Sequence, residues 1–284
     1  MPHMEQAERF RIRRFLYPTV FKKPGLDVEW EPSPGDVVDE MIGMAQVRGT
    51  DFVYDLGCGD GRVVIAAAAR TGAHGVGVDL DPRRIRESYE NALRAGVDGL
   101  TRFVNEDLFE ADISDATVLF LFLLPDVNCR LRPKLLRELK AGTRIVSYCH
   151  DMGRWQPDDV TRRMANHLYL WIAPGNMSGI WEGSIESGGR QLSLRMAMRQ
   201  EFQQVSGAVF VGRKVFQVKN AGMEGETFSF SDKDDPQGRG LTVSLRGVVG
   251  DHRITGTVQT HALPQERSPF TARRNPSTRM SLAQ

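Results

Sequence analysis

The stretch Val53-Tyr-Asp-Leu-Gly-Cys-Gly-Asp-Gly-Arg62 determines the fold predicted for the first part of this chain. A short apolar strand, 52–56, runs directly into three glycines at alternate positions, and an apolar helix follows at once. Glycine is needed where a chain turns sharply from strand to helix and where its backbone lies against a ligand, because it has no Cβ atom. The stretch therefore predicts a nucleotide-type ligand site at the end of a strand.

Acidic residues around these glycines indicate which ligand binds there. Dinucleotide sites use the spacing GxGxxG and bind a pyrophosphate at the helix N-terminus. Here the pattern is DxGxGxG, and the Asp55 and Asp60 carboxylates would repel a pyrophosphate but suit a ligand with an ammonium and a sulfonium. Asp79 ends the next strand, about 20 residues past the glycines, where an acid accepts hydrogen bonds from ribose hydroxyls. The arrangement resembles motif I of the class I S-adenosylmethionine (SAM)-dependent methyltransferases; a glycine-rich turn of another α/β protein is the alternative.

Composition limits the class of protein. The chain has 284 residues, 40% of them hydrophobic, which is enough for one large domain or two modest ones. A net charge of +1 gives no case for a nucleic-acid or membrane-surface binder. The three cysteines form no CxxC pair and the six histidines show no metal-ligand spacing. Since no run approaches the roughly 18 apolar residues of a membrane span and the N-terminus has no apolar signal core, we predict a cytoplasmic protein without a metal site.

From residue 52 to residue 172, runs typical of strands alternate with runs typical of helices. This alternation predicts an α/β fold, a doubly wound Rossmann-like sheet of seven strands with its ligand at the carboxyl ends of the strands. Asp55, Asp79 and Asp107 all fall at such ends. A further helix begins at Pro34, with Ser33 as its cap. The expected strands are 52–56, 75–79, 101–105, 117–124, 143–148 and an edge hairpin of 158–163 and 167–172, with helices at 61–70, 81–95 and 126–139 between them.

After Pro174-Gly175 the pattern changes to strand-type alternation with turn residues at short intervals. This predicts a small antiparallel all-β domain, barrel-like, over 175–261. The domain organisation that we expect is a basic-aromatic leader at 1–29, the cofactor domain at 30–174, the β-domain, and a disordered tail at 262–284, which is rich in proline, serine and arginine. The β-runs expected from the sequence are 180–185, 192–198, 209–218, 227–231, 241–249 and 252–258.

Further pieces of sequence narrow the resemblance to one group. Over residues 28–174 the chain is similar to the archaeal broad-specificity protein-lysine methyltransferase and to the mitochondrial lysine methyltransferases with seven strands. The β-domain has no counterpart in the compact archaeal enzyme. The pieces that carry the resemblance, besides the glycine stretch, are Trp30-x-Pro-x-Pro34, Glu110-Ala-Asp-Ile-Ser-Asp-Ala-Thr117, Phe122-Leu-Leu124 with Asn128, Pro133-Lys-Leu135, Gly142-Thr-Arg-Ile-Val-Ser147, Trp155-x-Pro157 and Leu168-Tyr-Leu170.

The resemblance implies a SAM cofactor and assigns residues to it. The methionine part would lie on Asp55 and the glycines, the ribose on Asp79, and the adenine amino group on Asp107. A turn residue after a strand is the alternative for Asp107. The full set of cofactor-binding residues that it implies is Asp55, Gly57, Cys58, Gly59, Asp79, Leu80, Asp107 and Leu108.

The residues after the fourth strand bear on the methyl acceptor. Methyltransferases of amide and exocyclic amino nitrogens have Asn/Asp-Pro-Pro-Tyr there, whereas this chain has Leu123-Leu-Pro-Asp126. The sequence is therefore compatible with a flexible aliphatic amine, such as lysine. Asp126 and His150 are candidates to take its proton. Aromatic walls could hold this amine by cation–π contact. The candidate substrate pocket is Trp30, Pro32, Phe122, Tyr148 and Trp155. The alternative is that these residues belong to the core or to a lid.

Three functions remain open at this stage. The first is methylation of lysine side chains in a protein substrate. The second is methylation of a small molecule at N, O or S, with the β-domain shaping the substrate site; Trp181, Phe210, Phe216 and Phe228 would line a cavity there or fill the core. The third is a non-catalytic SAM-binding protein. We also expect the β-domain to offer a surface for homo-oligomers.

Overall fold

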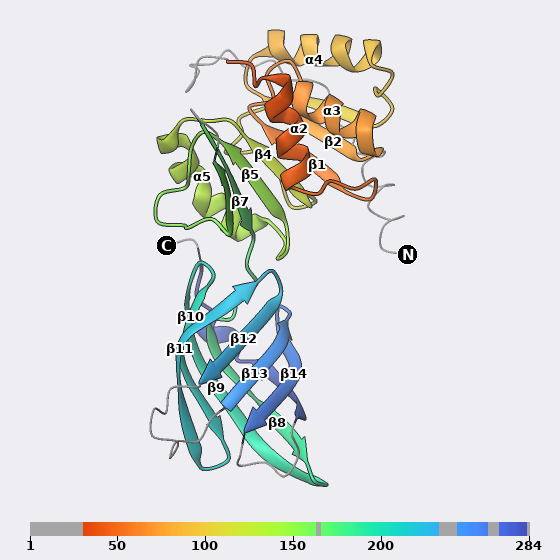
Figure 1. Cartoon of the computed structure of the whole chain (residues 1–284). Coiled ribbons are helices and arrows are strands. Elements are labelled where there is room, and N and C mark those ends of the chain that lie inside the picture. Colours follow the sequence, from red (N-terminus) through yellow and green to blue (C-terminus); the bar gives the residue numbers. More distant parts are fainter. Residues whose placement is uncertain (1–30, 163–165, 233–242, 261–266, 283–284) are drawn as a thin grey trace. The chain divides into compact units, whose positions relative to one another are not determined.

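The computed structural model describes residues 31–162, 166–232, 243–260 and 267–282. The chain divides into two compact units, and the boundary along the sequence falls between Ala173 and Pro174 (Figure 1). The leader 1–29 and Trp30 lie outside the described residues. In the described part of the chain, no helix is both long enough and apolar enough to cross a membrane.

The first unit is built on a seven-stranded sheet with the order β3-β2-β1-β4-β5-β7-β6. Neighbouring strands from β3 to β5 run parallel, whereas β7 is antiparallel to both β5 and β6. This confirms the predicted doubly wound α/β fold. The strands are β1 (Phe52–Leu56), β2 (His74–Asp79), β3 (Thr101–Asn105), β4 (Val118–Leu121), β5 (Arg144–Tyr148), β6 (Asp159–Arg162) and β7 (His167–Ile172), and the helices are α2 (Gly35–Met44), α3 (Arg62–Thr71), α4 (Pro82–Arg94) and α5 (Pro125–Glu138).

Strands β1 and β4 lie in the centre of this sheet and are buried throughout. A central parallel strand is covered on both faces, which explains why its sequence is a continuous apolar run. Strand β4 is shorter than the expected 117–124, because Leu124 already caps helix α5 and Pro125 begins it. Helix α2 also differs from the expectation: Pro34 is its cap residue and no side chain caps it, so Ser33 does not.

The second unit is a closed antiparallel barrel of eight strands in sequence order, in which the last strand returns to pair with the first. Closure leaves no unpaired sheet edge. The predicted β-domain is thus confirmed as a complete up-and-down barrel. Its strands are β8 (Gly179–Ser187), β9 (Arg190–Glu201), β10 (Gln204–Val211), β11 (Lys214–Glu224), β12 (Thr227–Asp232), β13 (Val243–Val249), β14 (Arg253–Thr260) and β15 (Ser268–Arg274).

Two expectations for this unit are wrong. The tail 262–284 is not disordered throughout, because Ser268–Arg274 forms strand β15, paired with both β14 and β8. Buried positions of β15 alternate with less buried ones, among them exposed Pro269 and Arg273. The segment therefore has the alternation of a strand although its composition is polar. The run 209–218 is two strands, β10 and β11, which turn at Gly212 with φ of 58°.

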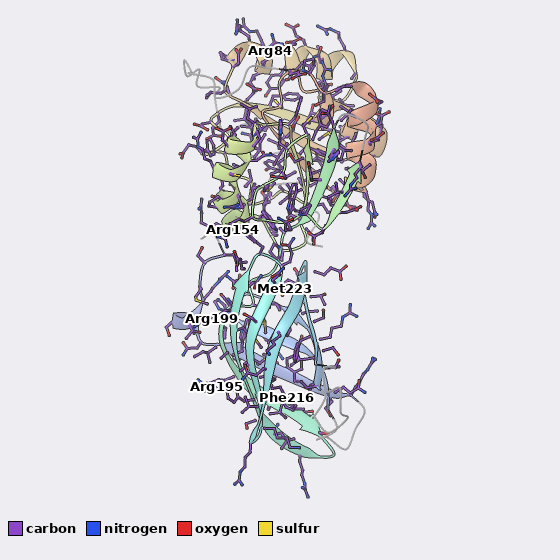
Figure 2. The ribbon with its side chains drawn as sticks, turned by 60° about the vertical axis from the view of Figure 1, so that its left-hand side comes forward. Arg84, Arg154, Arg195, Arg199, Phe216 and Met223 are labelled. Atoms are coloured by element: carbon purple, nitrogen blue, oxygen red, sulfur yellow. The ribbon has the colours of Figure 1, made fainter. Side chains whose placement is uncertain are left out.

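Apolar side chains fill the barrel. Trp181 and Phe228 are fully buried and Phe216 nearly so, which places them in the core. Phe210 lies instead under the guanidinium of Arg195, at 5.7 Å. Figure 2 labels Phe216 and Met223 from the core together with Arg195 and Arg199, two exposed positions of β9. The aromatic residues that were candidates for a cavity lining therefore serve packing.

Candidate active site

The glycine stretch makes the turn from β1 to α3. Gly57, Gly59 and Gly61 have φ values of 86°, 54° and 80°, in the left-handed region that favours glycine. A Cβ atom on Gly61 would also lie 2.7 Å from the Phe103 ring. The amides of Gly57 and Cys58 donate to the carbonyl of Val78, at 2.8 and 3.0 Å, so the turn is attached to the end of β2.

Asp79, at the carboxyl end of β2, accepts one backbone hydrogen bond on each carboxylate oxygen. The Gly59 amide donates to Oδ2 and the Asp81 amide to Oδ1, both at 2.8 Å. Burial raises the pKa of Asp79, and these two hydrogen bonds oppose the increase. Each oxygen keeps a lone pair, so the carboxylate can accept from the two hydroxyls of a ribose.

Asp55, at the end of β1, is a buried carboxyl at the centre of the site. Burial raises its pKa to about 8, and the neighbouring charges of Asp79 and Asp60 add to the effect. Within the described residues, no group donates a hydrogen bond to this carboxyl. Ionising a buried acid of this kind is costly unless a cation pairs with it, and the ammonium of a ligand would do so.

Asp60 has a different role from that expected. Its carboxylate binds the Arg62 guanidinium through two contacts, 2.6 Å to Nη2 and 2.9 Å to Nε. Arg62 also donates from Nη1 to the carbonyl of Ser33, at 2.9 Å. The pair therefore neutralises Asp60 and ties the segment before α2 to the glycine turn. This role was not predicted because it rests on a contact between residues 29 positions apart.

Asp107 follows β3 and shapes the next loop. Its Oδ1 accepts from the amide of Phe109 at 2.9 Å, and its carbonyl accepts from the amides of Glu110 and Ala111. It is thus a turn residue, and it also lies on the cleft described next. The two interpretations offered for Asp107 are compatible.

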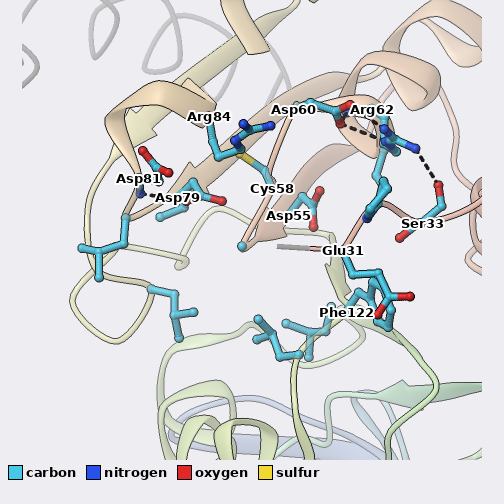
Figure 3. A pocket seen from close by; sticks show the side chains of 18 of the residues that line it. Glu31, Ser33, Asp55, Cys58, Asp60, Arg62, Asp79, Asp81, Arg84 and Phe122 are labelled. Atoms are coloured by element: carbon cyan, nitrogen blue, oxygen red, sulfur yellow. Dashed lines mark hydrogen bonds and ion pairs between the residues drawn. The ribbon is translucent and has the colours of Figure 1, made fainter. Parts of the chain in front are cut away.

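These residues surround one cleft at the carboxyl edge of the sheet, with about 1040 Å³ of atom-free space including its open mouth (Figure 3). Asp79, Asp81 and Arg84 stand at one end, Asp55 and Cys58 in the middle, and Glu31 with Phe122 at the other. The cleft brings together most of the predicted site residues: Pro32, Asp55, Gly57, Cys58, Asp79, Leu80, Asp107, Leu108 and Phe122. It adds others that were not predicted from the sequence: Glu31, Ser33, Arg62 and Arg84.

Other predicted residues do not line the cleft. Trp155 is fully buried, with its ring 6.1 Å from that of Trp171, so it cannot form a substrate wall. Tyr148 packs behind Phe122, with ring centroids 4.7 Å apart. Asp126 is exposed in the first turn of α5 and His150 follows β5; neither lines the cleft. Gly59 acts through its amide on Asp79.

Comparison with known proteins gives the family. The family described as the ANTKMT methyltransferase domain matches residues 55–159. A protein-lysine N-methyltransferase of Saccharolobus islandicus is 43% identical over 150 residues, which are 51% of this chain and 93% of that protein. The chain belongs to this family of SAM-dependent methyltransferases.

Two further proteins are similar to this methyltransferase. The adenine nucleotide translocase lysine N-methyltransferase of Mus musculus is 28% identical over 53% of this chain and 66% of its own length. A crystal structure described as an RNA methyltransferase from Salinibacter ruber in complex with S-adenosyl-L-homocysteine is 50% identical over 51% of this chain and 94% of that chain, with a TM-score of 0.50. These three relatives each match about half of the present chain.

The donor set of the cleft fits SAM. With SAM bound, Asp55 would face the ammonium of the methionine part, Asp79 would accept from the ribose hydroxyls and Asp107 would accept from the adenine amino group. Since Oδ1 of Asp107 is used in the turn, Oδ2 is the oxygen left for the adenine. The predicted cofactor is confirmed by the family and by its relative's complex with the demethylated product.

Proposed function

We propose that this methyltransferase methylates lysine side chains of a protein. The observation that carries the proposal is the acceptor end of the cleft, which is lined by the exposed Glu31 carboxylate and by the Phe122 ring. A carboxylate attracts an ammonium and an aromatic face holds it by cation–π contact. The name of the archaeal relative, which the chain covers almost completely, supports the same acceptor.

The residues of the cleft have little covalent chemistry to perform. Bound SAM supplies a methyl group on a sulfonium, a strong donor. Asp55 and Asp79 would hold the cofactor in one orientation for an amine that enters at the Glu31 end. The apolar lining of Phe122, Leu123 and Val127 would exclude water from the cleft.

The acceptor must lose a proton before it reacts. For a lysine with a pKa of about 10.4, deprotonation at neutral pH costs roughly 4–5 kcal/mol. Burial beside Phe122 would lower that pKa. Glu31 is exposed, so a proton that the ammonium loses there passes to solvent without a dedicated base.

RNA is the second candidate acceptor, because the Salinibacter ruber structure is described as an RNA methyltransferase. The Glu31 carboxylate favours an ammonium over a phosphate, which makes RNA the weaker candidate.

The test is transfer of label from methyl-labelled SAM to a lysate of the source organism, separated into protein and RNA. Asp79→Ala removes the ribose ligand, and Asp126→Ala is the matched control because this carboxylate is exposed and outside the cleft. We expect labelled methyl-lysine in hydrolysed protein, lost in Asp79→Ala and kept in Asp126→Ala. Label that is released by ribonuclease, and not by protease, would replace lysine with RNA as the acceptor.

A further inference from the structure

A second cavity lies beside the β6–β7 hairpin, and we call it the hairpin groove. It is formed by the loop after β5 on one side and by the two strands of the hairpin on the other. Its lining residues are Asp151, Gly153, Gln156, Pro157, Val160, Arg162, His167 and Tyr169.

Register places the groove on one face of the hairpin. Val160 pairs with Tyr169 and Arg162 with His167, so these four side chains project to the same side. The rings of His167 and Tyr169 lie 6.0 Å apart, and Tyr169 lies 5.8 Å from Trp171, giving the groove an aromatic side. Strand β6 is the edge of the sheet. Edge strands can pair with an extended peptide through their free backbone groups.

Cys149 connects the hairpin to the end of β5, next to the cofactor cleft. Its amide donates to the carbonyl of His167 at 2.9 Å, and it follows Tyr148, whose ring packs on Phe122 of the cleft. Burial raises the pKa of the Cys149 thiol, with a further contribution from the Glu31 carboxylate. The Cys149 backbone is held at φ of 67°, rare for a side chain with a Cβ atom. A backbone-constrained residue at the carboxyl end of β5 therefore lies between a hydrogen bond to the hairpin and a side chain packed on the cleft.

Charge indicates what the groove accepts. Asp151 lies near Tyr169, whose pKa is raised by burial and then by the Asp151 and Cys149 charges. Asp151 lines the groove and Glu31, whose charge acts on Cys149, lines the cofactor cleft, so each cavity has a carboxylate. His167 contributes an imidazole ring to the lining beside Tyr169. Arg162, also in the lining, suits a neutral or acidic residue farther from the target.

We propose that the hairpin groove binds the residues that flank the target lysine, as an extended segment along β6, while the lysine side chain passes Cys149 and Phe122 into the cofactor cleft. Basic residues next to the lysine are favoured by Asp151 and Glu31. This inference rests on the proposed lysine methylation and adds the means by which the enzyme selects its substrate.

The test uses two substitutions on neighbouring residues of β6. Val160→Arg fills the groove, whereas Thr161→Arg adds the same group on the opposite, exposed side of the strand. The probes are synthetic peptides with one central lysine flanked by two arginines, two serines or two glutamates on each side. Methyl transfer is measured from labelled SAM, and SAM affinity and thermal unfolding are measured for each variant.

We expect the arginine-flanked peptide to exceed the glutamate-flanked one by at least about fivefold in kcat/KM, a factor that a single exposed charge pair can supply. Val160→Arg should lower kcat/KM at least about tenfold, mainly through KM, with SAM affinity unchanged, and Thr161→Arg should stay within about twofold. Equal losses of kcat/KM in both variants, or no loss in Val160→Arg, would refute peptide binding in the hairpin groove.

The remaining outcomes separate this inference from the proposed function. If wild type labels lysine in lysate proteins but in no peptide, the enzyme recognises a folded surface, and the extended segment is wrong while lysine methylation stands. If neither lysate protein nor peptide is labelled, the proposed function itself fails. If an RNA oligonucleotide is methylated by wild type and not by Val160→Arg, the groove binds RNA and the peptide proposal is refuted.

Discussion

The protonation of Asp55 predicts how strongly SAM binding depends on pH. With a pKa of about 8, only about one in a hundred of these carboxyls is ionised at pH 6, and about half are ionised at pH 8. The ammonium of the ligand, with a pKa of about 8, loses its proton above that pH. If the bound state pairs the ionised carboxyl with the ammonium, Kd falls about 25-fold from pH 6 to pH 8 and rises again at higher pH.

The assay is isothermal titration calorimetry of SAM binding from pH 6 to pH 9 in two buffers of different ionisation enthalpy. At pH 6.5 the wild type should release about one proton for each SAM bound. Asp55→Asn should bind SAM about 10- to 100-fold more weakly at pH 8, the cost of a lost charged hydrogen bond, and should release no proton. A pH-independent Kd in the wild type, or an unchanged pH dependence in Asp55→Asn, would refute the pairing.

The raised pKa of Asp55 also determines how the stability of the first unit changes with pH. The pKa of Asp55 is about 8 in the folded protein, against 3.8 for an unperturbed aspartate, so between these values the folded state holds a proton that the unfolded state has lost. Its contribution therefore reduces stability as pH rises from 4 to 8, by up to about 4 kcal/mol at pH 7. In the absence of SAM, Asp55→Asn should remove this decline in urea unfolding of the first unit.

Three further predictions follow from the packing and from the adenine end of the cleft. Gly61→Ala should destabilise the first unit by about 1–3 kcal/mol in urea unfolding, because the residue has φ of 80° and its Cβ would meet Phe103; no loss would contradict the turn geometry. Gly256→Ala should lower barrel stability by about 1–3 kcal/mol, since its Cβ would lie 2.0 Å from a carbonyl oxygen of β13. Gly222→Ala, where a Cβ meets open space, should change stability by no more than about 0.5 kcal/mol. Thermal unfolding that ranks the two variants the other way would contradict this packing. Asp107→Ala should weaken SAM binding about tenfold in calorimetry with kcat little changed, and unaltered affinity would remove Asp107 from the adenine site.

The cofactor side of the site was predictable because its signals are local. Glycines at 57, 59 and 61 and acids at the strand ends act through the backbone turn in which they stand. The clamp between Arg62, Asp60 and Ser33 was not predictable, since it depends on which distant segment the guanidinium reaches.

On the acceptor side of the cleft, residue type alone was a poor guide to which side chains line the site. Trp155 was a candidate wall because it is aromatic and near a strand end, yet contact with Trp171 buries it. Glu31 was passed over between two predicted pocket residues, Trp30 and Pro32, although it lies on the cleft. Strand β15 was missed because its proline and arginines dominate the composition, while its partner β8 lies far away in the sequence.

The pairing of β15 with β8 has a consequence for synthesis. A growing chain finishes the first unit at Ala173, but the barrel cannot close until about 100 more residues have been made, which takes roughly 5–20 s at 5–20 residues per second. Until then β8 and β14 present open edges that can pair with other chains. A premature stop before Ser268 would leave both edges exposed for good, so such a product should aggregate even though its methyltransferase unit is intact.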